Sequence, residues 1–176
     1  MILPDEEDVM EFLRESNAIE GEYSLQALKD AEKAWKYAIT VSTFTSKEIL
    51  KVHNILSRKI MPKIAGKFRT CDVWIGGQHK RFIDSSLLKH QVDDALAEIV
   101  KSFTFKGDKS LIALDCHVMF EDVHPFVDGN GRTGRILYNW HRLQLGLPLH
   151  IIHEGREQME YYEWFRKPRR EEIDYE

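Results

Sequence analysis

The chain has 176 residues, of which 43% are hydrophobic and 31% are charged, and its formal net charge is −4. These values are typical of one globular domain, and they disfavour a disordered chain and a protein that binds nucleic acid through its phosphates. No run of eighteen apolar residues and no secretory signal occurs, and two cysteines are too few for a disulfide framework, so we expect a cytoplasmic protein without a membrane span.

The hydrophobic spacing in the first third of the chain predicts three helices. The first spans residues 5–20 and ends before Gly21, because glycine often terminates helices. The second spans residues 24–39. Thr45 and Glu48 have the spacing of a capping box, which predicts a third helix that runs to about residue 60.

The rest of the chain predicts one short β element and further helices. The helical spacing is lost between residues 63 and 83, where CDVWIGG alternates and then reaches two glycines, as in a short strand or hairpin. A helix that begins within residues 124–135 is expected to reach Leu145 and to end before Pro148. Other helices are predicted over residues 84–103, 108–123 and 154–166. The expected fold is therefore an all-α helical bundle with a small β-hairpin.

One segment, HPFVDGNGRTGR at residues 124–135, combines residue types that suit phosphate chemistry. Its Gly-Asn-Gly turn can direct several N–H groups into one concavity, and the positive end of the following helix adds to this anion site. Arg132 and Arg135 are three residues apart and therefore project from one side of a helix. Two guanidinium groups on that side suit phosphate oxygens.

The same segment contains a candidate base and a candidate metal ligand. His124 precedes Pro125 at the end of the preceding helix, and its imidazole can accept a proton near neutral pH. Asp128 lies at the edge of the turn, where a carboxylate beside bound phosphates is suited to hold Mg²⁺. Together these groups predict phosphoryl or nucleotidyl transfer.

This segment is similar to the signature of the Fic family, His-x-Phe-x-(Asp/Glu)-Gly-Asn-Gly-Arg-x-x-Arg, at every defining position. The stretch GKFRTCDVWIGG also resembles the family's flap, the hairpin that aligns the target peptide, and this likeness assigns Val73, Trp74 and Ile75 to target positioning. The resemblance implies a Fic-fold bundle that binds Mg-ATP and transfers AMP to a Tyr, Thr or Ser hydroxyl of another protein, with release of pyrophosphate.

The resemblance also implies a role for each residue of the signature. His124 is the implied catalytic base, Asp128 the implied Mg²⁺ ligand and Phe126 a buried apolar anchor. The implied phosphate-binding residues are Gly129, Asn130, Gly131, Arg132 and Arg135. Doc, the kinase-like relative, has a lysine at the position of Gly131, so a glycine there favours AMP transfer over phosphate transfer.

In similar proteins an asparagine one turn further along the helix and a tyrosine of the next helix hold the adenosine. The asparagine corresponds to Asn139, and the tyrosine to Tyr161 or Tyr162, of which we favour Tyr162. An aromatic ring at this place can stack on the purine. The alternative is that Asn139 is a surface residue and Tyr162 belongs to the core.

The segment from Ser16 to Gly21, SNAIEG, is similar to the family's inhibitory motif, (Ser/Thr)-x-x-x-Glu-(Gly/Asn). Because it precedes the core, the resemblance implies a class II Fic protein. Glu20 would pair with Arg135, fill the γ-phosphate volume and misalign ATP, while Ser16 fixes the helix by a hydrogen bond. The alternative interpretation, which does not use the resemblance, is that Glu20 is an ordinary surface residue at a helix end.

We therefore expect an inhibitory helix within residues 1–22, a Fic core over residues 23–167 and a charged tail over residues 168–176. The expected partners are ATP and a hydroxyl-bearing protein, while self-modification and a homodimer are open. Three other functions are also open. The first is removal of AMP from a modified protein, with Glu20 positioning a water, and the second is a catalytically silent module that binds proteins. The third is transfer of another nucleotide or phosphate-containing group, because the turn and the arginines recognise phosphates and not bases.

Overall fold

The computed structural model describes residues 3–75, 78–80 and 84–166, and the expected charged tail at residues 168–176 lies outside them. The described elements are, in chain order, α1 (Glu6–Ala18), α2 (Leu25–Ala38), α3 (Ser46–Ser57), β1 (Val73–Ile75), β2 (Gln78–Lys80), α4 (Ser85–Ser102), α5 (Lys109–Val123), α6 (Asn130–Gln144) and α7 (Arg156–Glu163). The prediction of an all-α fold with a small β element is confirmed. No described helix is long and apolar enough to cross a membrane.

Polar side chains explain where most of the helices begin. Four helices, α1, α2, α4 and α5, start after a residue whose side chain accepts a hydrogen bond from an N–H of the first turn, namely Asp5, Ser24, Asp84 and Asp108. At the start of α3, Thr45 and Glu48 form the predicted capping box. These caps satisfy N–H groups that have no partner within the helix.

Two glycines determine where α1 and α6 end. Gly21 has φ +69°, and Gly146 has φ +78°. After α6, the N–H of Leu147 donates to the carbonyl of Arg142 at 2.9 Å, as expected when a left-handed glycine closes a helix. Helix α6 therefore ends before Pro148, as predicted, and Gly146 rather than the proline closes it, because the chain has already reversed two residues before Pro148.

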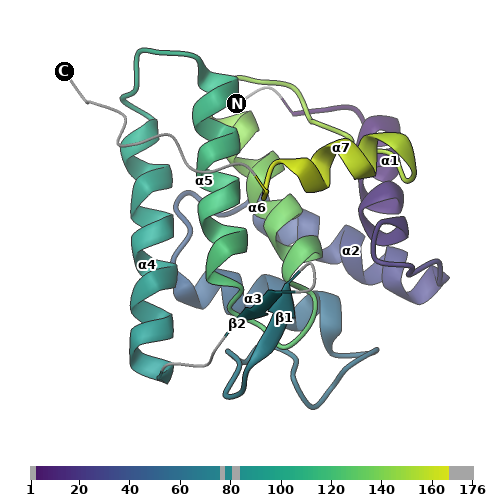
Figure 1. Ribbon diagram of the computed structural model, residues 1–176. Helices are drawn as coiled ribbons and strands as arrows, with labels where there is room; N and C mark the ends of the chain where they lie inside the picture. The colour runs from purple at the N-terminus through teal and green to yellow at the C-terminus, as the bar shows by residue number, and fades with distance from the viewer. Residues whose placement is uncertain (1–2, 76–77, 81–83, 167–176) are drawn as a thin grey trace.

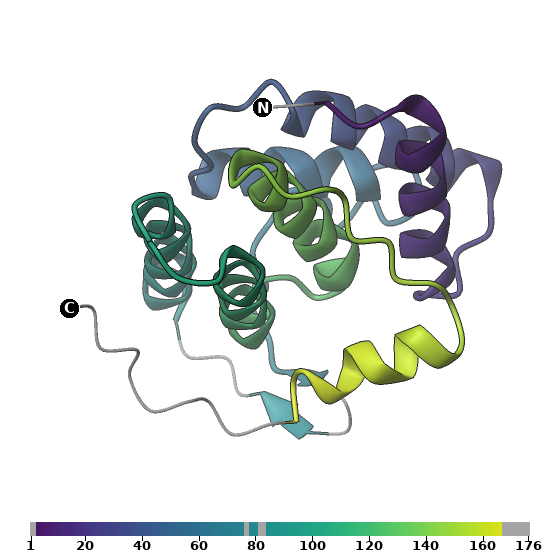
Figure 2. The same ribbon diagram turned by 90° about the horizontal axis from the view of Figure 1, so that it is seen from above.

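Helix α6 is the central helix of the bundle, and α1, α2, α3 and α5 pack around it, with α4 beside α5 (Figures 1 and 2). Its side chains Ile136, Leu137 and Trp140 are almost fully buried. Helix α1 belongs to the same core, because Phe12 packs edge-on against Trp35 of α2 with 5.5 Å between the ring centroids. The element that carries the expected inhibitory motif is thus anchored in the domain.

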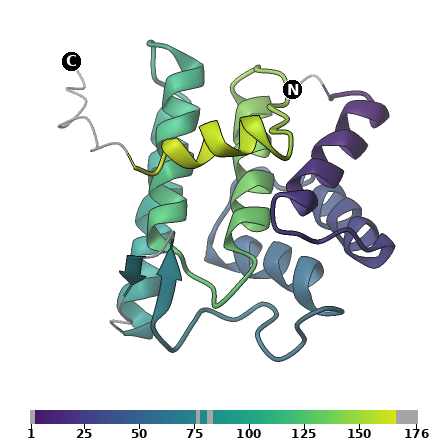
Figure 3. The same cartoon turned by 45° about the vertical axis from the view of Figure 1, so that its right-hand side comes forward.

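The two peripheral elements lie on different parts of the bundle. Helix α7 passes across α6 with its N-terminal end toward α1, and the strands lie near the end of the bundle where α5 ends and α6 begins (Figure 3). The strands pair antiparallel, with Val73 opposite Lys80 and Ile75 opposite Gln78, which confirms the predicted β element. Val73 is buried, whereas Trp74 is 69% exposed.

Candidate active site

The loop between α5 and α6 contains two residues with left-handed backbone conformation. His124 follows α5 with φ 47° and ψ 62°, and it is the one non-glycine residue with positive φ in the described chain. Gly129 follows with φ 79° at the N-cap of α6. The left-handed region costs energy for a histidine, so neighbouring contacts must hold His124 in this conformation.

Asn130 closes the loop from within. Its side-chain oxygen accepts a hydrogen bond from the N–H of Phe126 at 2.8 Å, and its side-chain nitrogen donates to the Phe126 carbonyl at 2.9 Å. Phe126 is fully buried, as the sequence predicted for the apolar anchor. The Asn130 amide therefore shapes the turn, and a direct contact between this side chain and phosphate stays a prediction.

His53 of α3 is a second support of the turn. Its ring stacks on Phe126 with 3.8 Å between the centroids, and its Nε2 lies 3.0 Å from the carbonyl oxygen of Asp128. The N–H of Gly66 donates to Nδ1 at 3.0 Å, so we assign the proton to Nε2, which donates to the Asp128 carbonyl. Burial lowers the pKa of His53 to about 4, and the ring is therefore neutral at pH 7.

Arg69 joins the loop to the chain that leads into β1. Its Nε donates to the carbonyl of His124 and its backbone N–H to the carbonyl of Pro125, both at 2.9 Å. Its Nη1 donates to the carbonyl of Cys71, also at 2.9 Å, and the side chain is almost fully buried. Arg69 therefore fixes the backbone of the predicted base relative to the strands.

The N-terminus of α6 is suited to receive an anion. Gly129 occupies the N-cap, so α6 begins without the side-chain cap that each of α1 to α5 has. Arg132 is buried, and its Nε has no hydrogen-bond partner among the residues that the structure describes. Uncapped N–H groups beside a buried guanidinium group favour a phosphate at this end of the helix.

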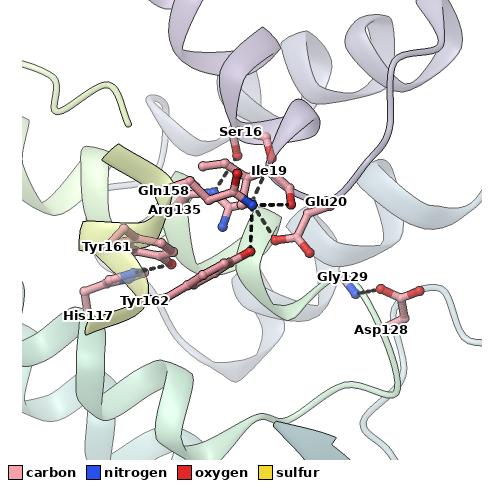
Figure 4. Close-up of polar contacts among 10 residues, drawn as sticks. All are labelled: Ser16, Ile19, Glu20, His117, Asp128, Gly129, Arg135, Gln158, Tyr161 and Tyr162. Carbon is pink, nitrogen blue, oxygen red and sulfur yellow. Dashed lines mark hydrogen bonds and ion pairs between the residues drawn. The ribbon is translucent and has the colours of Figure 1, made fainter. Parts of the chain in front are cut away.

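Arg135, less than one turn after Arg132, is held by the C-terminal end of α1 (Figure 4). Its Nε donates to the Oγ of Ser16 at 2.9 Å, and its Nη2 donates to the Ser16 carbonyl at 2.8 Å and to Oε1 of Glu20 at 2.7 Å. The Arg135 side chain is 2% exposed, whereas that of Glu20 is 35% exposed. The structure therefore contains the ion pair and the serine hydrogen bond that the N-terminal motif led us to expect.

Gly131 allows Glu20 to lie directly over the first turn of α6. A Cβ atom at position 131 would be 2.2 Å from Oε1 of Glu20 and 2.8 Å from Nη1 of Arg135. Any side chain at this position would therefore displace the carboxylate or the guanidinium group. The Glu20 carboxylate therefore lies beside the first turn of α6, close to its uncapped N-terminus.

Asp128 is exposed at the edge of the turn, and its Oδ1 accepts a hydrogen bond from the N–H of Gly129 at 2.5 Å. The described part of the chain contains no group of three or more His, Cys, Asp or Glu residues that could hold a metal ion by themselves. A single exposed carboxylate nevertheless fits Mg²⁺, because in nucleotide sites this ion is held by one or two carboxylates together with phosphates and water.

Asn139 is not a surface residue, since its side chain is 1% exposed. Its Nδ2 donates to the carbonyls of Arg135 and His150 at 3.3 and 3.2 Å, and its Oδ1 accepts from the N–H of His150 at 2.7 Å. These bonds fasten the segment that follows α6 to the helix. A contact of Asn139 with adenosine stays a prediction, and in this structure its amide is bound to backbone.

The two candidate tyrosines of α7 have different surroundings. Tyr161 is buried, and its hydroxyl lies 3.1 Å from Nε2 of His117. Tyr162 is half-buried, and its hydroxyl accepts a hydrogen bond from Nε2 of Gln158 at 3.0 Å (Figure 4). Tyr162 is therefore the more accessible of the two, and its contact with adenosine stays a prediction.

Two supports of the loop, His53 and Arg69, were missing from the predicted site. Arg69 lies inside the stretch that resembles the flap, and its place directly before the expected strand was a usable signal. His53 lies in the middle of α3, 75 residues before the carbonyl that it contacts, and no spacing or motif in the sequence points to it.

A search of known protein families matches residues 43–141 to the Fic/DOC family. The match covers more than half of the chain and includes the whole segment from His124 to Arg135. The protein therefore belongs to the Fic/DOC family.

Curated relatives of this chain have names that state an activity. The chain is 32% identical to the protein adenylyltransferase Fic of Aedes aegypti over 123 residues, which are 69% of this chain and 24% of the relative. It is 33% identical to the protein adenylyltransferase fic-1 of Caenorhabditis briggsae over 122 residues, which are 65% of this chain and 22% of the relative. This chain thus spans about a quarter of the length of these relatives.

Solved structures with the same fold support the predicted Fic-fold bundle. A Fic domain containing signaling protein from Bacteroides thetaiotaomicron has a TM-score of 0.72 at 17% identity, and the match covers 91% of this chain and 70% of that one. A fragment of Fic-1 from C. elegans has a TM-score of 0.72 at 22% identity, with 89% of this chain and 54% of that one covered. The all-α prediction with a Fic fold is confirmed.

Proposed function

We propose that this protein is an adenylyltransferase, which moves AMP from ATP to a hydroxyl side chain of a target protein. The observation that carries the proposal is the uncapped N-terminus of α6, which follows His124 by six residues and bears the buried Arg132 and Arg135. The names of the curated relatives support the same chemistry.

In this proposal the phosphates of ATP bind to the N–H groups at the start of α6 and to the guanidinium groups of Arg132 and Arg135. His124 accepts the proton of the target hydroxyl, and the hydroxyl oxygen attacks the α-phosphorus. The bond from the α-phosphorus to the oxygen that bridges the β-phosphate breaks, so that AMP is joined to the target and pyrophosphate leaves. The two arginines stabilise the charge that develops on the pyrophosphate.

Asp128 is the residue that would hold Mg²⁺ beside the phosphates. When bound, the ion neutralises phosphate charge and assists the departure of pyrophosphate. The position of Asp128 is fixed through its backbone, because its carbonyl accepts the hydrogen bond from His53. Tyr162 and Asn139 are proposed to hold the adenosine, and the strand residues Val73, Trp74 and Ile75 to align the target.

We further propose that α1 restrains this reaction, which places the protein in class II. Glu20 bonds the guanidinium group that is needed for the γ-phosphate, and its carboxylate stands over the first turn of α6. ATP that binds beside Glu20 would have its α-phosphate out of line with the incoming hydroxyl. A displacement of about 1 Å costs roughly a hundredfold in rate.

A second function uses the same residues and is favoured by the position of Glu20. A carboxylate next to the start of α6 can orient a water toward an AMP group bound there, and the protein would then remove AMP from a modified target. Incubation of the wild-type protein with an AMP-modified protein and Mg²⁺ tests this function, because release of free AMP is expected only if the hydrolysis occurs.

The position of the label in ATP tests the main proposal. The Glu20→Gly variant is incubated with a cell lysate, or alone to detect self-modification, in the presence of ATP labelled at the α- or at the γ-phosphate. If AMP is transferred, the Glu20→Gly protein should give labelled protein with α-labelled ATP and not with γ-labelled ATP. The Glu20→Gly, His124→Ala double variant should give no labelled protein with either. Label from the γ-phosphate, or no label from a variant that binds ATP, would contradict the proposal.

A further inference from the structure

The segment after α6 touches the inhibitory end of α1 at several points, although it lies outside the proposed phosphate site. Because it reaches α1 on the face next to Glu20, we propose that Gln158 and His153 are positioning residues that hold Glu20 over Arg135. This inference rests on the proposed function, since it concerns the restraint of the same site. We call the two residues together the α1 clasp.

Gln158 bonds the residue that directly precedes Glu20. Its Nε2 donates to the carbonyl of Ile19 at 3.2 Å and to the hydroxyl of Tyr162 at 3.0 Å (Figure 4). Its Oε1 accepts from the N–H of Gly155 at 3.1 Å. The amide is therefore held on both sides within α7 and its N-cap. This orientation fixes the carbonyl of Ile19, the C-cap of α1, and with it the position from which the Glu20 side chain extends.

His153 holds α1 two turns earlier. Its Nε2 lies 3.1 Å from Oε1 of Glu11 in α1, and its Nδ1 lies 2.8 Å from Oε2 of Glu157 in α7. The next residue adds a backbone contact, since the N–H of Glu154 donates to Oε2 of Glu15 at 2.9 Å. The contacted positions 11, 15 and 19 are four residues apart, so one face of α1 rests on this segment over its last two to three turns.

An apolar contact lies beneath these polar ones. Ile19, Ile152 and Tyr161 form a small buried cluster that is separate from the main core. Tyr161 also lies beside Arg135, with the guanidinium carbon 5.7 Å from the ring centroid. The segment that carries the α1 clasp is therefore packed against Arg135 and against Ile19, the residue that precedes Glu20.

The geometry explains why Glu20 needs such support. Glu20 itself contacts Arg135 through one carboxylate oxygen, and its side chain is 35% exposed. One ion pair with a partly exposed carboxylate does not fix the Glu20 side chain firmly, because water competes for that carboxylate. The position of the Glu20 backbone, which Gln158 sets through Ile19, thus determines how often the carboxylate covers the anion site.

The experiment measures self-modification with α-labelled ATP for Gln158→Ala and His153→Gln in the otherwise wild-type chain. We expect a rise of about two- to tenfold for Gln158→Ala, which loses a hydrogen bond to Ile19, and about twofold for His153→Gln. The matched control is Glu160→Gln, which removes an exposed ion pair with Arg156 on the same helix and should leave the rate unchanged.

The same substitutions are then made in the Glu20→Gly background, where no restraint is left to release. If the clasp acts through Glu20, His153→Gln does not change the rate there, and Gln158→Ala, which also loses a bond to Tyr162, does not change kcat at saturating ATP; a change in either quantity would overturn the inference. Unchanged rates for both clasp variants beside an active Glu20→Gly protein would also overturn it, while leaving the proposed function intact.

Hydrogen exchange supplies a readout that does not depend on activity. In the wild-type chain, Gln158→Ala should increase the exchange of the amides of residues 17–22 and leave those of α6 unchanged. His153→Gln, whose side chain is 46% exposed, carries little risk of unfolding and should give the same pattern more weakly. Equal exchange in all three proteins would reject the clasp, whereas an inactive Glu20→Gly protein would reject only the proposed transfer of AMP.

Discussion

The loop before α6 and the end of α1 meet at the same two turns of α6, but they are held in different ways. The loop is fixed through its backbone by groups that are buried, namely His53, Arg69 and Asn130. At the end of α1, Ser16 and Ile19 are buried as well, but the Glu20 side chain and the His153 side chain that bonds α1 are partly exposed.

Because of this difference, we call the loop before α6 the permanent part of the site and the end of α1 the adjustable part. Buried bonds to backbone groups cannot be exchanged for water without local unfolding, whereas exposed ion pairs contribute about 0–1 kcal/mol each. Phe12 and Leu13 anchor the middle of α1 in the core, so a release of the restraint needs only its last turn to move. In the proposed mechanism, the loop before α6 therefore stays assembled while Glu20 leaves.

The largest effect is expected when the permanent part loses its base. His124→Ala in the Glu20→Gly background should reduce the rate of AMP transfer by about a hundredfold to ten-thousandfold, because the proton of the target hydroxyl has no acceptor. The affinity for ATP, measured by calorimetry, should stay the same. A variant that retains more than a tenth of the rate would show that His124 is not the base.

A smaller loss is expected when the support of the base is weakened. Arg69→Lys keeps the charge but cannot bond the His124 and Cys71 carbonyls together, so the left-handed His124 becomes less well fixed. We expect the rate to fall by roughly ten- to a hundredfold in the Glu20→Gly background, with unchanged ATP affinity. Arg58→Lys, at an exposed arginine, is the control, and equal rates in the two variants would refute this role.

Three buried histidines, one of which supports the permanent part, predict how the stability of the protein changes with acid. Burial lowers the pKa of His53 to about 4, that of His117 to about 3 and that of His141 to about 4. Below about pH 6.5 these histidines therefore become protonated in the unfolded chain while they are still neutral in the folded chain. Their contribution to stability is complete above about pH 6.5 and is lost as the pH falls toward 4.

Urea unfolding between pH 7 and pH 4.5 measures this effect. Each such histidine should lower the free energy of unfolding by about 1.4 kcal/mol for each pH unit within that range. His53→Gln should reduce the slope of the unfolding free energy against pH by the contribution of one histidine. His90→Gln, at an exposed position, serves as the control. If His53→Gln and the wild type show the same slope, His53 is not held neutral.

The smallest effect is expected at the adjustable part. Hydrogen bonds to Glu11 and Glu157, together with the charge of Glu15, raise the pKa of His153 to about 9. Its contribution is therefore fully present below about pH 6.5 and is lost as the pH rises through 9. Because His153 is exposed to solvent, a stability difference of a few tenths of a kcal/mol is expected. The wild type should exceed His153→Gln in stability at pH 6 and equal it at pH 10; a constant difference would contradict the assignment.

The sequence predicted those features of the fold and site that depend on residues close together in the chain. Side-chain caps and Gly21 place helix ends through contacts within four residues, and the 124–135 segment contains its own turn, arginines and base. Asn139 shows where local signals end, because its partner is the backbone of His150, whose path depends on how the chain returns along α6. The clasp residue Gln158 was missed for the same reason, since 139 residues separate it from Ile19.

Competition for one anion site is the central claim, and calorimetric titration with magnesium tripolyphosphate tests it without a target protein. The wild type is compared with Glu20→Gln, which keeps the size of the side chain and removes its charge. Glu20→Gln should bind tripolyphosphate at least about tenfold more tightly, because the carboxylate no longer competes at the start of α6, and Arg135→Gln should abolish the gain. Equal dissociation constants for the wild type and Glu20→Gln would contradict the account.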